Sequence, residues 1–180
     1  RLTPRAMIAA AAADLASLTV ALRPSVAIIG TGDELAPPGE AHWRADAIPE
    51  SVTHGVAAMI GQAGARVVAR TIGLDDLPAL EAVAGTALDA ADVVIVTGGA
   101  SVGERDFAKP MFAAHGLVLV FAKVAIKPGK PVWLGRARGK WVLGLPGNPT
   151  SAMVTARLFL LPLLARLQGQ SLAELLRWRR

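Results

Sequence analysis

Two short runs that are apolar throughout, rather than at every second position, limit the folds open to this chain. Residues 92–96 (DVVIV) and 25–30 (SVAIIG) are almost entirely aliphatic, which is typical of strands buried on both faces of a sheet. Segments with helical spacing of apolar residues alternate with such strands, over about 52–63, 77–88 and 149–167. This order predicts an α/β fold, a three-layer sandwich with a mostly parallel sheet and helices on both faces. Residues 132–135 and 140–143 flank a glycine-containing turn and add a β-hairpin.

The composition excludes several classes of protein. Hydrophobic residues make up 53% of the chain and charged residues 18%, so the chain can bury a core and is not disordered. It has no cysteine and its three histidines form no metal-ligand spacing, which excludes a zinc-thiolate site and suits a cytoplasmic protein. The net charge is +5, but five basic residues lie at the chain ends. These are Arg1, Arg5, Arg177, Arg179 and Arg180. Without them the body is neutral, and we expect no nucleic-acid binding.

Three parts are expected along the chain. Residues 1–22 form a leading helix and linker, in which Thr3 caps a helix that starts at Pro4. Residues 23–170 form the α/β domain, and residues 171–180 form a basic tail. The longest apolar run, 158–165, contains Pro162 and is shorter than the roughly 20 residues a membrane span needs. No membrane span and no signal peptide are expected.

Glycine turns and polar side chains follow the expected strands. The segments are TGDE (31–34), GLDD (73–76), TGGASVGERD (97–106), KVAIKPGKP (123–131) and GLPGNPTS (144–151). Each also has a purely structural interpretation as a tight turn, a helix cap, an exposed basic turn or a capped helix start. Ligands of open α/β sheets bind beyond the carboxyl ends of the strands. The five segments together therefore predict one crevice for a phosphorylated ligand, a second oxyanion and a divalent cation.

Four ordered motifs resemble the molybdopterin molybdenumtransferases, the molybdenum-inserting enzymes of cofactor synthesis, which are similar to the gephyrin E domain. The motifs are GDEL (32–35) with a following Pro-Gly, GGASVGERDF (98–107), KVAIKPGKP (123–131) and GLPGNPTSA (144–152). The resemblance covers about 23–169 and implies the central molybdopterin-binding domain only. Related molybdopterin adenylyltransferases share the fold and the glycine loop but lack the pairing of the last two motifs.

The resemblance implies a reaction and its partners. The substrates would be adenylylated molybdopterin and molybdate, Mg²⁺ would assist, and AMP would be released. A molybdopterin adenylyltransferase would act upstream, and a full-length protein would be a homodimer. The family enzymes are longer than this chain, so we expect the 180 residues alone to have weak or no activity. The alternatives are an adenylyltransferase and a non-catalytic pterin-binding module.

The resemblance also implies site residues by position. Catalytic roles would fall to Asp106, Lys123, Lys127, Asp75 and Glu34, with Asp106 and Glu34 as magnesium ligands. The candidates for substrate binding are Thr31, Gly32, Asp33, Gly98, Gly99, Ser101, Lys130, Pro146, Gly147, Asn148, Pro149 and Ser151. One triplet departs from the family pattern, because Glu50-Ser51-Val52 stands where Asp-Ser-Asn or Asp-Thr-Asn is usual.

Overall fold

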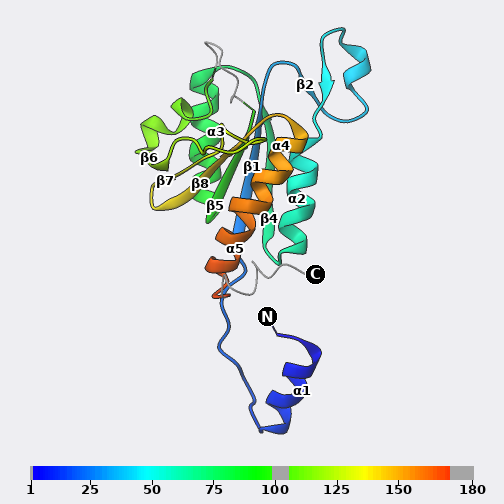
Figure 1. The fold of residues 1–180 in the computed structure, drawn as a ribbon, viewed down its shortest axis with the longest axis vertical. Coiled ribbons are helices and arrows are strands. Elements are labelled where there is room, and N and C mark those ends of the chain that lie inside the picture. The colour runs from blue at the N-terminus through cyan, green and yellow to red at the C-terminus, as the bar shows by residue number, and fades with distance from the viewer. Residues whose placement is uncertain (1, 99–105, 171–180) are drawn as a thin grey trace.

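A six-stranded sheet in the order β4-β1-β5-β8-β7-β6 forms the centre of the computed structural model, which describes residues 2–98 and 106–170 (Figure 1). The strands are β1 Ser25–Thr31, β4 Arg66–Gly73, β5 Val93–Thr97, β6 Val118–Phe121, β7 Trp133–Ala137 and β8 Lys140–Leu145. β1 is parallel to β4 and β5, and β5 is parallel to β8, whereas β7 is antiparallel to both β8 and β6. Every strand except β7 therefore runs the same way, and five carboxyl ends lie at one edge. The predicted fold class is confirmed.

The two apolar runs occupy the centre of the sheet. β5 is buried at every residue, and β1 is buried from Val26 onward. Val93 and Ile95 pack into the core on one face, and Val94 and Val96 pack into the core on the other. A strand with a core on each side needs apolar residues at every position, which explains the pattern that the sequence shows.

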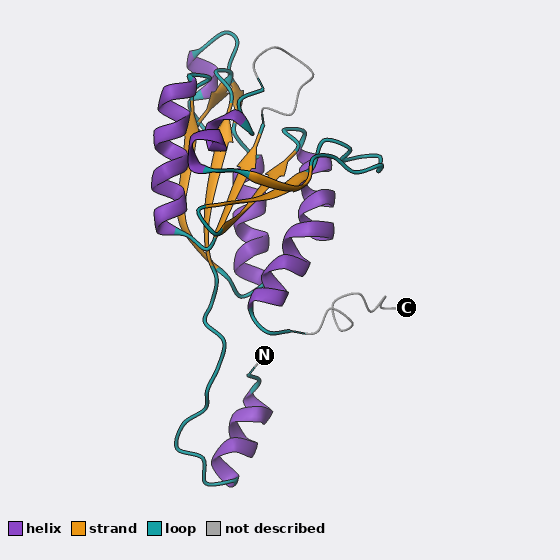
Figure 2. Ribbon diagram, turned by 90° about the vertical axis from the view of Figure 1, so that its left-hand side faces the viewer, coloured by secondary structure: helices purple, strands orange, loops and turns teal. Residues whose placement is uncertain are grey.

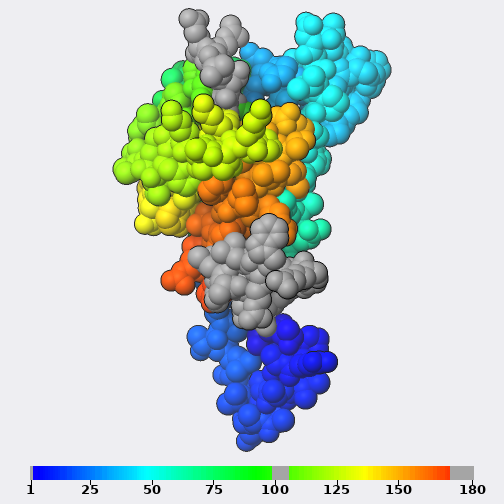
Figure 3. All heavy atoms as spheres, in the orientation of Figure 1, coloured from blue at the N-terminus to red at the C-terminus, as the bar shows by residue number. Residues whose placement is uncertain are grey.

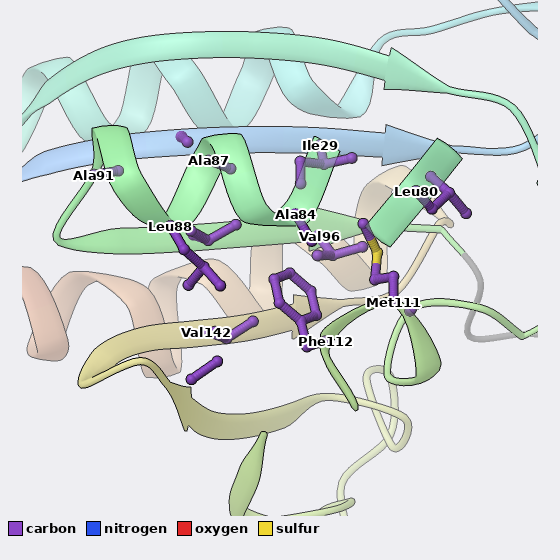
Figure 4. Close-up of a cluster of buried hydrophobic side chains, with 14 of the residues drawn as sticks. Ile29, Leu80, Ala84, Ala87, Leu88, Ala91, Val96, Met111, Phe112 and Val142 are labelled. Carbon is purple, nitrogen blue, oxygen red and sulfur yellow. The ribbon is translucent and has the colours of Figure 1, made fainter. Parts of the chain in front are cut away.

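Helices cover both faces of the sheet (Figure 2). On one face lie α2 Val52–Gln62 and a long helical segment that begins with α4 Pro149–Thr155 and ends with α5 Leu161–Leu167. On the other face lie α3 Leu77–Ala90 and the 3-10 helix η2 Pro110–His115. Figure 4 shows this second core, in which Leu80, Leu88, Met111 and Phe112 are almost fully buried (Figure 4).

Three predicted elements differ from the structure. The helix expected near 106–114 is only η2, because Pro110 starts it and Gly116, in a left-handed conformation, ends it. The strand expected over 117–125 is only β6, which has a single neighbour and a register shift against β7. The loop expected over 36–50 contains the 3-10 helix η1 Ala41–Trp43 and a two-stranded sheet of β2 Leu35–Ala36 and β3 Ile48–Pro49. The hairpin of β7 and β8 is confirmed, with Arg138 and Gly139 both at positive φ in its turn.

The helical segment Pro149–Leu167 contains a π-helical turn, η3 Ala156–Leu160. Pro162 has no N–H to donate to the carbonyl of Leu158, and the wider turn absorbs this break. The segment has 19 residues and a mean hydropathy of 1.3 in its most apolar window, so by length and composition alone it could cross a membrane. A third of that window is buried (33%), and core helices meet the same criteria, so this is a weak indication.

The first helix, α1 Pro4–Ala12, stands away from the sheet. Its N-cap is Thr3, whose hydroxyl accepts a hydrogen bond from the amide of Ala6, as predicted. None of its residues is buried. Figure 1 shows it beyond the edge where β1 begins, at the opposite end from the carboxyl edge of the sheet, and Figure 3 shows the same segment in blue at the bottom of the molecule. The helix therefore contributes nothing to the cleft at the carboxyl edge described below.

Asp92 links the starts of β1 and β5 through hydrogen bonds. Its Oδ2 accepts hydrogen bonds from the Ser25 amide (2.9 Å) and hydroxyl (2.6 Å), and its Oδ1 lies 3.7 Å from the Lys140 ammonium. The bond from the Ser25 hydroxyl, followed by the bond from its amide, lowers the pKa of Asp92 below its ordinary value. A lowered pKa in the folded state stabilises the fold above the unfolded-state pKa, and this contribution is lost as the pH falls.

We therefore expect Asp92→Asn to lower the free energy of unfolding at neutral pH. The difference from wild type should shrink as the pH falls below 3.8, the ordinary pKa of aspartate, because the wild-type carboxylate then becomes protonated too. Urea denaturation of both proteins across this pH range measures the effect. A difference that does not change with pH would mean that the charge of Asp92 is not what stabilises this contact.

Candidate functional site at the carboxyl edge of the sheet

A cleft of about 280 Å³ opens where the ends of β1, β5 and β8 meet the start of α2. Its lining residues come from four connections that are far apart in the sequence. They are Thr31, Glu34, Leu35, Ile48, Pro49, Glu50, Ser51, Val52, Thr97, Gly98, Gly147 and Pro149. Five of them were predicted as site residues, namely Thr31, Glu34, Gly98, Gly147 and Pro149. The cleft lies where open α/β sheets bind ligands.

Close backbone contacts form the floor of the cleft. Gly98 has φ +94°, and a Cβ at this position would collide with the carbonyl oxygen of Thr31. A Cβ on Gly147 would lie 3.3 Å from the Cα of Gly98. The Thr31 hydroxyl donates a hydrogen bond to the carbonyl of Thr97 at 3.4 Å. The turns after β1, β5 and β8 can pack this closely because two of them place glycine at the contact.

The turn after β1 links to the turn after β4. The carboxylate of Asp33 accepts a hydrogen bond from the amide of Asp75 (2.9 Å), and its carbonyl accepts one from Arg44 (2.6 Å). The amide of Gly32, at φ +144°, donates to the carbonyl of Gly73 (3.3 Å). Asp33 thus fixes the turn, and Asp75 lies beside it without lining the cleft. Asp76 caps α3, which agrees with the expectation that one acid of this pair is a cap.

Glu50 is a buried carboxyl group that lines the cleft, and it was not among the predicted site residues. It is 3% exposed. Its Oε1 accepts a hydrogen bond from the amide of Thr53 (2.7 Å), and its Oε2 accepts one from the Thr53 hydroxyl. Its amide donates to the carbonyl of Ala36 (2.8 Å), next to the β2–β3 pair. The altered family triplet was the only sequence signal that pointed to this position.

The start of α4 forms another wall of the cleft. Asn148 caps this helix as predicted, because its side-chain oxygen accepts a hydrogen bond from the amide of Ser151 (3.1 Å). Pro146 is buried, whereas Gly147, Asn148 and Pro149 are exposed. Ser151 is half-buried, one turn into the helix. These residues lie at the predicted edge of the sheet.

The three predicted lysines lie on a separate turn. Lys123, Lys127 and Lys130 are exposed, and the turn is closed by a hydrogen bond from the amide of Val124 to the carbonyl of Lys130 (3.1 Å). Gly129 packs directly against Thr155 of α4. None of the three lysines lines the cleft. The expectation that all five connections line one crevice is therefore only partly met, because packing against α4 holds this turn.

Asp106 also lies outside the cleft lining. It is half-buried, and its carboxylate accepts a hydrogen bond from the amide of Ala108 (3.2 Å). Gly99 and Ser101 lie outside the described residues. Within residues 2–98 and 106–170, no three acidic or histidine side chains come together in a group that could hold a metal ion. The expected pair of magnesium ligands, Asp106 and Glu34, is therefore not part of a larger group of such side chains among the described residues, and we derive no step through this ion.

The sheet with helices on both faces and the cleft at its carboxyl edge define an α/β ligand-binding domain. A family model described as a probable molybdopterin binding domain matches residues 27–166. The chain belongs to this family, as its motifs indicated.

Similar proteins are longer than this chain. Molybdopterin molybdenumtransferase 2 of Mycobacterium tuberculosis is 38% identical over 174 residues, which cover 93% of this chain and 42% of that protein. The molybdopterin molybdenumtransferase of Haemophilus influenzae is 36% identical, covering 94% and 42%. A crystal structure of a molybdopterin biosynthesis moea protein from Pyrococcus horikosii superimposes with a TM-score of 0.73 at 34% identity, covering 82% of this chain and 36% of that one. This chain thus corresponds to less than half the length of these relatives.

Proposed function

We propose that this domain binds adenylylated molybdopterin in molybdenum cofactor biosynthesis and takes part in inserting molybdate, with release of AMP. The observation that carries the proposal is the cleft whose floor is made by Thr31, Gly98 and Gly147. Two of these, Gly98 and Gly147, belong to motifs shared with the molybdenumtransferases, and a third motif follows Thr31 directly. The motifs are distant in sequence, and the fold brings them into contact.

The lysine turn supplies the positive charge that the proposed reaction needs. Both the adenylyl phosphate and molybdate are oxyanions, and ammonium groups stabilise such charge as it is held or displaced. Lys123, Lys127 and Lys130 are exposed, so a ligand can reach all three. The ligand would span from the cleft to this turn. Catalytic roles for Asp75, Asp106 and Glu34, and a requirement for Mg²⁺, remain predictions.

Binding of the adenylylated ligand by the 180-residue chain tests the proposal. We expect Lys127→Ala to weaken this binding about tenfold or more, because a charge-assisted bond to phosphate is lost. Lys140→Ala is the matched control, because Lys140 pairs with Asp92 at the opposite edge of the sheet and should leave affinity unchanged. No binding by wild type, or equal affinity of wild type and Lys127→Ala, would contradict the proposal.

Product analysis separates the proposed activity from its alternatives. The short length of the chain relative to its relatives favours binding with little or no turnover. With molybdate and Mg²⁺ present, we expect little AMP. An adenylyltransferase would instead release pyrophosphate from ATP and molybdopterin. A homodimer and an upstream adenylyltransferase partner are proposed only for a longer protein.

A further inference from the structure

Charge is segregated between the cleft and the lysine turn. Among the described residues that line the cleft, two are acidic, Glu34 and Glu50, and none is lysine or arginine. The three lysines lie on the turn that packs against α4. A phosphate or molybdate in the cleft would meet these carboxylates with no cation among the described lining residues, which is unfavourable. The cleft is suited instead to an uncharged group that donates hydrogen bonds.

Glu50 has acceptor capacity beyond the bonds that hold it. Each carboxylate oxygen can accept two hydrogen bonds. The amide and hydroxyl of Thr53 use one position on each oxygen and fix the carboxylate at the start of α2. Because the residue is 3% exposed and lines the cleft, a ligand there meets a fixed acceptor rather than a mobile surface acid.

The remaining walls are suited to a flat ring. Apolar side chains from three segments line the cleft, namely Leu35, Ile48, Pro49, Val52 and Pro149. A volume of about 280 Å³ is small for a ligand site and would not hold a whole adenylylated pterin. A heteroaromatic ring with apolar faces and N–H donors on one edge matches both the walls and the acceptor.

We propose that the cleft takes the pterin ring of the ligand and that Glu50 is its specificity-determining acceptor, bonding to the 2-amino group, while the phosphate end lies toward the lysine turn. This inference rests on the proposed function and adds the orientation of the ligand. A hydrogen bond from the 2-amino group to this carboxylate would be charge-assisted.

Two phosphate-free probes test the orientation: 6-hydroxymethylpterin, and its lumazine analogue, which carries an oxygen in place of the 2-amino group. Calorimetric titration into the full 180-residue chain should show that wild type prefers the pterin about tenfold or more, because the lumazine turns an acceptor toward Glu50. Glu50→Gln should weaken pterin binding by a similar factor and bring the ratio of the two affinities close to one. Lys127→Ala should leave the affinity for the phosphate-free pterin unchanged.

Thr53→Val controls for the structural role of Glu50. This change removes the hydroxyl that holds Oε2, lowering the thermal midpoint, but it leaves the carboxylate in place, so the preference for pterin over lumazine should persist.

The inference is overturned if wild type does not distinguish the two rings, if neither ring binds, or if Glu50→Gln retains the wild-type ratio. Parallel titration with adenylylated molybdopterin shows whether a failed ring test contradicts only the orientation of the ligand or the proposed function as well. If this ligand binds while the ring tests fail, only the orientation is wrong; if it does not bind, the proposed function fails as well.

Discussion

Truncating Phe112 to alanine should lower the free energy of unfolding by about 3–5 kcal/mol. Phe112 is fully buried in η2, and its ring meets the edge of the Trp133 ring at a centroid distance of 6.4 Å. Figure 4 shows the ring between α3 and the sheet, near Leu88, Met111 and Val142. Removing it costs the transfer free energy of the ring and leaves a cavity between layers that cannot close fully. Urea denaturation with linear extrapolation measures the loss.

Phe121→Ala is the matched control, since it deletes the same atoms from a half-buried position on the edge strand β6. It should cost clearly less than Phe112→Ala. Losses of equal size, or a loss below about 1 kcal/mol at Phe112, would show that η2 does not close the core on the α3 face.

The core of the fold could be predicted because each of its strands and helices has a recognisable pattern in its own residues. Val93–Val96 are apolar at each position since one core lies on each side of β5. Proline and Asn148 mark the start of the last helical segment, and the structure confirms the cap. In such cases the residues that make an element also carry its pattern.

The edges of the fold were less predictable, because their structure depends on distant neighbours. Val118, Leu119 and Val120 are as apolar as a buried strand, yet they are exposed on β6, which pairs on one side only. The sequence alone gives no sign that this strand ends at Phe121.

The candidate site also has one part that could be predicted from the sequence and another that could not. Glycine turns identified its floor, because close backbone contacts require this residue type. Glu50 was missed as a site residue, since its burial depends on β2 and β3, two-residue strands too short to show a pattern. The lysine turn was expected in the cleft, but its contact with Thr155 places it against α4. Charge segregation therefore became visible only in three dimensions.

Replacing Gly98 by alanine should both destabilise the fold and close the site. Its φ of +94° is unfavourable for any side chain, and the new Cβ would collide with the Thr31 carbonyl oxygen, a backbone atom that cannot rotate away. β1 and β5 are hydrogen-bonded neighbours, so relieving the collision must separate their ends or distort the turn. We expect a loss of about 3 kcal/mol or more. Binding of adenylylated molybdopterin should fall below detection, because Gly98 and Thr31 both line the cleft.

Gly39→Ala is the control that measures the cost of the backbone strain alone, without the collision. Gly39 has almost the same φ, +93°, but a Cβ there would have no neighbour within 4 Å. It should cost only about 1 kcal/mol, the strain of a left-handed alanine, and leave ligand affinity unchanged. Chemical denaturation and ligand titration of both variants give the comparison. If the two substitutions cost the same, the contact between the turns after β1 and β5 does not constrain the fold. If Gly98→Ala still binds the ligand at wild-type affinity, the floor made by Thr31 and Gly98 is not where the ligand lies.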